Sequence, residues 1–193
     1  MIKKEIRVLG ISFTEPHVKG PVPVQVVGVV YRGNRWLEGV MRATAPLEVT
    51  DITPSIVKMI TRSSHFPQLR VLALDRLVSR SGRYVDIRVL SRKTKLPALA
   101  VLRQRIPAEP LRKPPRGSGK QTLKAFAKVP CREWKAVKKF YVYHVGLGEM
   151  DFEQLLEVCA SREGVPEAAR VAGLASSSLE KVLVAYFPRD PRV

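Results

Sequence analysis

Apolar residues in the N-terminal third of this 193-residue chain fall into short, β-branched runs separated by turn residues. Residues 6–13 form the first predicted strand, and residues 24–31 and 36–43 form two more. Gly33 and Asn34 lie between the last two runs, a pair that is typical of an antiparallel hairpin. The chain therefore begins with strands that pair in antiparallel fashion.

The next part of the chain alternates between helical and strand patterns. Thr53 and Pro54 predict the start of a helix, because threonine caps helices and proline fits their first position. Residues 68–74 form a short buried strand, residues 84–94 a helix, and residues 97–102 another strand. This order predicts right-handed crossovers and a mixed α/β sheet flanked by helices.

The C-terminal half begins with residues 106–119, where Pro and Gly are spread among basic residues. Such a segment forms no regular element and is typical of loops that order on RNA. Five further segments follow: a partly helical stretch, a strand, two helices, and an apolar end that forms a last strand or a docked tail. They cover residues 120–139, 140–145, 151–162, 167–181 and 182–187.

Length and composition bound the class of protein. A hydrophobic fraction of 45% and a charged fraction of 26% are ordinary for a globular chain. One domain over residues 1–193 is expected, with a basic, Pro/Gly-rich insertion at about 103–139. No run reaches the roughly 18–20 apolar residues of a membrane helix. The N-terminus runs straight into a strand without a signal region, so we expect a cytoplasmic protein.

The cysteines and histidines predict no zinc site. Cys131 and Cys159 form no Cys-x-x-Cys pair. His17, His65 and His144 have no metal-ligand spacing between them. A single asparagine among many charged residues instead suggests a thermophile.

Charge narrows the choice of partner. Lys and Arg number 34 against 17 Asp and Glu, a formal net charge of +17. Such a chain is attracted to polyanions, because each cation that neutralises a phosphate releases a counterion. Twelve basic residues opposed only by Glu109 and Glu133 are predicted to contact nucleic acid; the alternative is a solvated basic loop. They are Arg103, Arg105, Arg112, Lys113, Arg116, Lys120, Lys124, Lys128, Arg132, Lys135, Lys138 and Lys139.

Several sequence stretches, taken in order, carry a family resemblance. Residues 8–11, 27–33, 36–40, 68–75, 85–87, 95–97 and 164–172 together resemble an archaeal family that was long filed as a domain of unknown function and is related to endonuclease V. The resemblance implies a ribonuclease-H-like sheet of three antiparallel strands followed by parallel strands. It also implies a Mg²⁺ site built from carboxylates on strand one, at the end of strand four and on the following helix.

Carried over by position, Asp75 takes the place of the strand-four acid and Asp86 that of the helix acid. The strand-one acid falls at Ser12 or Phe13, neither of which replaces a carboxylate. Glu15 could swing into the missing position. The remaining alternative is that Asp75 and Asp86 cap the strand end and the helix start.

Arginines stand beside these candidate metal ligands. Arg76 stands where the family resemblance implies a glycine after Asp75, and Arg83 lies in the turn before Asp86. Because guanidinium groups pair readily with carboxylates, we expect ion pairs rather than a metal cage.

Three functional hypotheses therefore remain. The first is a non-catalytic nucleic-acid-binding protein that needs no cofactor and prefers RNA to DNA. Its candidate partners are structured RNA and the ribosome, and its candidate stacking residues are Trp36, Tyr84 and Trp134. The second is a Mg²⁺-dependent endonuclease acting on damaged DNA or RNA, with metal ligands among Asp75, Asp86 and Glu15. The third is a protein-interaction module whose charge aids solubility.

Overall fold

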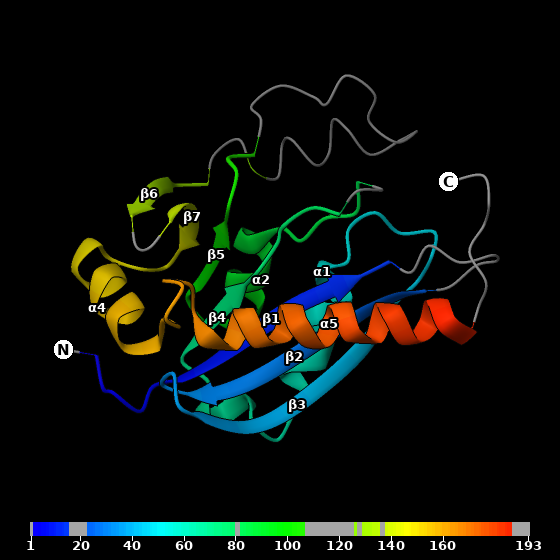
Figure 1. Cartoon of the computed structure of the whole chain (residues 1–193), viewed down its shortest axis with the longest axis horizontal. Helices are drawn as coiled ribbons and strands as arrows, with labels where there is room; N and C mark the ends of the chain where they lie inside the picture. The colour runs from blue at the N-terminus through cyan, green and yellow to red at the C-terminus, as the bar shows by residue number, and fades with distance from the viewer. Residues whose placement is uncertain are drawn as a thin grey trace.

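A seven-stranded sheet runs through the part of the chain that the computed structural model describes, residues 2–15, 23–79, 82–106, 126, 129–135 and 138–186. The strand order is β3-β2-β1-β4-β5-β7-β6 (Figure 1). The bounds are Arg7–Thr14 for β1, Val24–Arg32 for β2, Trp36–Ala45 for β3, Val71–Leu74 for β4, Ala98–Leu102 for β5, Cys131–Lys135 for β6 and Lys139–Val145 for β7.

The sheet is mixed, as the sequence pattern predicts. The strands β1, β2 and β3 pair antiparallel, and β4 and β5 then join β1 in parallel. The strand β7 returns antiparallel between β5 and β6. Three antiparallel strands followed by parallel strands are therefore confirmed.

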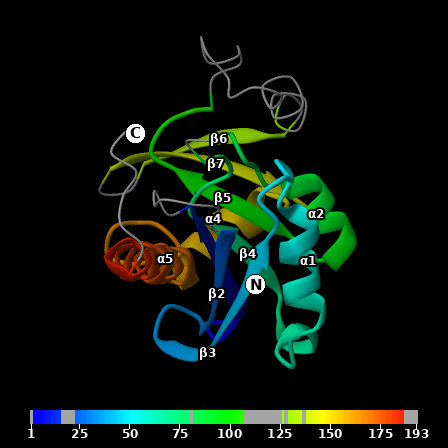
Figure 2. The ribbon, with the colours of Figure 1, turned by 90° about the vertical axis from the view of Figure 1, so that its right-hand side faces the viewer.

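Helices cover both faces of this sheet (Figure 2). The helices α1 (Thr53–Thr61) and α2 (Ile87–Thr94) lie on one face, and α4 (Glu149–Cys159) and α5 (Glu167–Tyr186) on the other. A short 3₁₀ helix, Phe66–Gln68, precedes β4. None of the helices among the described residues is long and apolar enough to cross a membrane.

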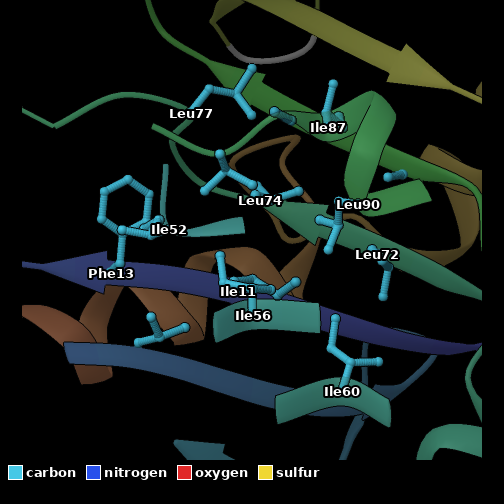
Figure 3. Close-up of a cluster of buried hydrophobic side chains, with 14 of the residues drawn as sticks. Ile11, Phe13, Ile52, Ile56, Ile60, Leu72, Leu74, Leu77, Ile87 and Leu90 are labelled. Carbon is cyan, nitrogen blue, oxygen red and sulfur yellow. The ribbon is translucent and has the colours of Figure 1, made fainter. Parts of the chain in front are cut away.

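Alternating side chains of the central strands fill two cores. Ile11, Phe13, Leu72 and Leu74 point toward α1 and α2, where they meet the isoleucines of those helices (Figure 3). Their neighbours, among them Val8, point toward α4 and α5. The period of two in a strand thus sends successive residues of β1 and β4 to opposite faces.

Gly10 fixes how closely α5 approaches the sheet. A Cβ at this position would collide with the backbone carbonyl of Ala168 in the first turn of α5. The missing side chain lets the helix backbone rest directly on β1. The small buried residues Ala168, Ala169 and Ala172 serve the same close packing.

Two predicted helix starts are wrong. The N-cap of α1 is Ile52, and Thr53 does not cap it. The Thr53 hydroxyl oxygen instead accepts a hydrogen bond at 2.8 Å from the backbone N–H of Asp86. The helix predicted from residue 84 begins at Ile87, because the Asp86 side chain caps it.

The C-terminal part also differs from expectation. The strand β6 lies within the stretch predicted to be partly helical, and it joins the sheet edge beside β7. Residues 182–186 continue α5 and form neither a last strand nor a docked tail. No Gly or Pro follows Gly173 before residue 186, so nothing in the sequence stops the helix.

We expect Gly10→Ala to lower the free energy of unfolding by about 1–3 kcal/mol, because the added carbon pushes α5 off the sheet. The comparison is Gly28→Ala, whose methyl group meets side chains instead of backbone: Cγ of Met41, Cε of Met59 and Cδ1 of Leu9. Urea unfolding of both variants measures the difference. Equal losses would show that the approach of α5 to Gly10 is not a tight constraint.

Candidate functional site

The carboxyl ends of β1 and β4 bring Ser12 and Asp75 together. Ile11 stands opposite Leu74 in the parallel register, so the next residue of each strand also lies close. The Ser12 hydroxyl donates a hydrogen bond of 3.0 Å to Oδ2 of Asp75, and the Asp75 backbone N–H donates to the Ile11 carbonyl at 3.3 Å. Ligands of open α/β sheets bind at such strand ends, which makes this edge the candidate site.

Arg76 binds the same carboxylate. Its Nη2 donates to Oδ2 of Asp75 at 3.1 Å, and its Nε lies 3.3 Å from both carboxylate oxygens. The guanidinium carbon also stands 6.0 Å from the centre of the Phe13 ring, within cation–π range. The expected ion pair between Arg76 and Asp75 is therefore present in the structure.

The environment of Asp75 disfavours the charged form of its carboxyl group. Burial raises its pKa above the ordinary 3.8, and the opposing effects of Arg76 and Ser12 do not cancel the loss of hydration. A perturbed carboxyl at the end of a central strand is a common mark of a functional site.

Glu15 is engaged by other partners. Its Oε1 lies 3.0 Å from Nε of Arg83, and the Ser79 hydroxyl donates to the same oxygen at 3.0 Å. Arg83 therefore pairs with Glu15 rather than with Asp86. The Glu15 carboxylate is bound by an arginine, which opposes its use as a replacement metal ligand.

Asp86 lies on the opposite face of the sheet from Asp75. Its Oδ1 accepts the backbone N–H groups of Arg88 and Val89 at 2.9 and 3.2 Å, which caps α2 on the α1/α2 face. Asp75 instead faces α5, where a Cβ on Gly173 would come within 2.8 Å of its Oδ2. The helix-capping alternative thus describes Asp86.

These residues do not fit a Mg²⁺ cage. Magnesium takes near-octahedral oxygen ligands that converge on one point. The three candidate carboxylates go to separate partners: Asp75 to Arg76, Glu15 to Arg83 and Asp86 to the start of α2. Among the residues that the structure describes, no group of three or more His, Cys, Asp or Glu side chains could hold a metal ion.

Two cavities adjoin Arg76 at this edge. The arginine-lined cavity, of about 450 Å³, is bordered by Arg76, Arg103 and Arg170. The glutamate-lined cavity, of about 390 Å³, is bordered by Glu15 and Glu180. Asp75 and Arg76 border both. The guanidinium of Arg76 therefore stands between a basic and an acidic recess.

Sequence reasoning missed the contribution of α5 to this edge. Arg170 borders one cavity, and Glu180 borders the other and accepts a hydrogen bond of 2.8 Å from the Thr14 hydroxyl. Both belong to a helix whose inward face also carries Gly173 and Ser176, the latter fully buried. Polar or small residues at helical spacing were the available signal, but that pattern does not say which strand the helix covers.

Part of the predicted basic cluster comes together on the β6–β7 hairpin. Lys139 hydrogen-bonds Glu133 at 2.9 Å, and this bond, with the nearby charges of Lys139, Lys135 and Arg105, lowers the pKa of the Glu133 carboxyl. The Lys139 ammonium lies 5.3 Å from the centre of the Tyr141 ring. We call Arg105, Lys135 and Lys139 the hairpin cation cluster.

The other predicted basic residues are placed differently. Arg103 lies 3.7 Å from Glu163, and Lys138 is exposed. Arg132 lies near His144, and its charge, after the larger effect of burial, lowers the pKa of that imidazole. Outside the described residues lie Arg112, Lys113, Arg116, Lys120, Lys124 and Lys128.

The three candidate stacking residues differ in their exposure to solvent. Tyr84 is buried and packs edge-on against Phe126, and Trp134 packs edge-on against Phe152. Trp36 is 60% exposed, but it lies on the edge strand β3. Two of the three aromatic side chains therefore belong to the cores.

Comparison with known proteins places this architecture. A family model described as endonuclease dU matches residues 4–180. A UPF0215 protein of Methanothermobacter thermautotrophicus is 30% identical over 191 residues, 92% of this chain and 89% of that protein. A solved Archaeoglobus fulgidus protein superposes with a TM-score of 0.70 at 23% identity, covering 90% of this chain and 98% of that one.

A second solved structure carries nucleic acid. Endonuclease V of Ciona intestinalis, in complex with a 23mer DNA containing an inosine followed by a ribo-adenosine, superposes with a TM-score of 0.57 at 13% identity. The match covers 92% of this chain and 86% of that one. The shared fold confirms the predicted ribonuclease-H-like sheet.

We expect Asp75→Asn to raise the stability of the protein at neutral pH. The folded state binds the Asp75 proton more tightly than the unfolded chain does, so the stability from this group is complete below about pH 3.8 and is lost as the pH rises through the higher folded-state pKa. Denaturant unfolding should therefore give the variant a larger free energy of unfolding than the parent at pH 7, and an equal one below about pH 3.8. A less stable variant at pH 7 would mean that the Arg76 pair outweighs the burial cost.

Proposed function

The chain belongs to the endonuclease dU family, an archaeal family similar to endonuclease V, and we propose that it binds nucleic acid on this nuclease scaffold without cutting it. One observation carries the proposal. At the carboxyl end of β1 a serine hydroxyl, not a carboxylate, meets Asp75, and a guanidinium takes up the remaining charge of that acid.

The chemistry of the residues at the carboxyl ends of β1 and β4 supports binding rather than cleavage. Two-metal cleavage of a phosphodiester needs carboxylates that hold two cations about 4 Å apart. A guanidinium already pinned to Asp75 competes with any such cation for the carboxylate. Arginine instead offers fixed N–H donors, which suit the oxygens of a phosphate group.

The charge distribution supports phosphate contacts. The hairpin cation cluster joins three exposed cations to a half-buried Tyr141 at one sheet edge. Cations with an aromatic ring nearby are typical of surfaces that follow a single strand. The net charge of +17 adds long-range attraction to any polyanion.

Structured RNA is the partner that we propose, with the ribosome as the most abundant source. The proposal rests on the basic, Pro/Gly-rich composition of residues 106–119, which is typical of segments that order on RNA.

We expect the full-length protein to bind an RNA hairpin, whose loop presents a single strand, more tightly than the DNA hairpin of the same sequence, with an affinity that falls as NaCl rises. Each phosphate contact on a single strand contributes about 0.7 to the slope of log K against log salt. Replacing Lys135 and Lys139 by Gln should lower that slope by about 1.4. Fluorescence anisotropy across a salt series measures both quantities.

The control replaces Lys58 and Lys93 by Gln, which removes the same charge from exposed positions of α1 and α2, outside the hairpin cation cluster. An affinity that does not respond to salt would contradict the proposal. Pull-down from cell lysate, with and without ribonuclease, identifies the partner. Recovery of ribosomal particles that ribonuclease does not release would contradict RNA-mediated attachment.

A metal-dependent endonuclease is the second candidate. The family description favours it, as does the position of Asp75 at the end of β4. We expect no cleavage of uracil- or inosine-containing DNA or RNA with either Mg²⁺ or Mn²⁺, because Arg76 engages the central acid. Gel analysis of end-labelled strands measures this. Cleavage that Asp75→Asn abolishes would replace the binding-only proposal.

A further inference from the structure

Three arginines from three separate elements border the arginine-lined cavity. Arg76 follows β4, Arg103 follows β5, and Arg170 lies in the first turns of α5. The cavity walls between them are largely apolar, from Val101, Leu102, Val165 and Ala169. Apolar walls strengthen the attraction of these charges for an anion, because they keep water at a distance.

Carboxylates hold two of these guanidinium groups while leaving donors available. Arg76 uses Nε and Nη2 on Asp75, and Arg170 uses Nε and Nη2 on Glu167 at 2.8 and 2.6 Å. Within the described residues, neither Nη1 group donates a hydrogen bond to the protein. A guanidinium fixed on one edge and open on the other is already oriented for a ligand oxygen.

Arg103 is held loosely by comparison. Its Nη2 stands 3.7 Å from Glu163, and its side chain is 68% exposed. Such a surface ion pair contributes little to stability, so the guanidinium is able to turn from Glu163 toward a ligand at small cost.

The cavity offers an anion oriented donors rather than an excess of positive charge. Asp75 and Glu163 border it beside the three guanidinium groups, and Glu167 balances Arg170. The glutamate-lined cavity on the other side of Arg76 is bordered by three carboxylates, Asp75, Glu15 and Glu180, and by Arg76 as its one basic residue among those described, so it is the less favourable of the two for an anion. An anion at this edge therefore belongs on the side of Arg170.

We propose that the arginine-lined cavity binds a phosphodiester group of a nucleic-acid strand, with Arg76 and Arg170 as its donors and Arg76 supplying the positive charge that a metal ion supplies in a carboxylate site. The inference rests on the proposed function and names the place where the strand backbone is held. Binding there needs no divalent cation.

We expect Arg76→Gln and Arg170→Gln each to weaken binding of a short single-stranded oligonucleotide by about tenfold, the loss of one charge-assisted phosphate contact. Each should also lower the salt slope by about 0.7. Arg92→Gln, on the exposed end of α2 across the sheet, is the matched control and should change neither. Wild-type affinity should be the same in chelator.

Glu167→Gln distinguishes a phosphate contact made by Arg170 from a purely structural role of the Arg170–Glu167 ion pair. It breaks the same ion pair as Arg170→Gln but leaves the guanidinium in place. A phosphate contact predicts that Glu167→Gln retains or gains affinity while Arg170→Gln loses it. A purely structural pair predicts that both variants lose affinity equally, with matching losses in thermal unfolding temperature, and that result would overturn the inference.

Failure of the two proposals can be told apart. Wild-type protein that binds no oligonucleotide at low salt would refute the proposed function. Wild-type protein that binds normally, while Arg76→Gln behaves like Arg92→Gln, would refute the cavity site alone. Binding that chelator abolishes would also refute it.

Discussion

The parallel pairing of β1 with β4 beneath α5 is the contact on which the site depends. It places Ser12 against Asp75, and Gly10 lets α5 approach closely enough to add Arg170 and Glu180 to the same edge. Helix and strands are far apart in sequence, so only their packing creates the recess. Backbone contact at Gly10 fixes the helix more firmly than flexible side chains would.

The same packing sets the electrostatics. Placing Asp75 between β1 and α5 removes water from its carboxylate, and that loss of hydration outweighs the help from Ser12 and Arg76. Arg76 then stands where two cavities of opposite character meet. A scaffold similar to endonuclease V thereby presents a guanidinium, rather than a carboxylate cage, at the end of β4.

Prediction from sequence succeeded where the signal was local. The hairpin of β2 and β3, the buried strands β4, β5 and β7, and the pairing of Arg76 with Asp75 all follow from neighbouring residues. It failed where partners lie far away along the chain. Thr53 bonds Asp86 across 33 positions instead of capping its helix, and Arg83 reaches Glu15 rather than the nearby Asp86.

The sequence by itself determined the mixed sheet, the family and the absence of a strand-one acid. The spacing of apolar residues and the residue type at each position are properties of the chain alone and do not depend on which residues meet in space. Only the tertiary structure decided which charges meet. It separated Asp86 from Asp75 onto opposite faces, gathered Arg105, Lys135 and Lys139 around Glu133, and brought Arg170 beside Arg76. Ion pairs and cavities depend on distances in space, and those are set by how helices and strands pack rather than by their order in the chain.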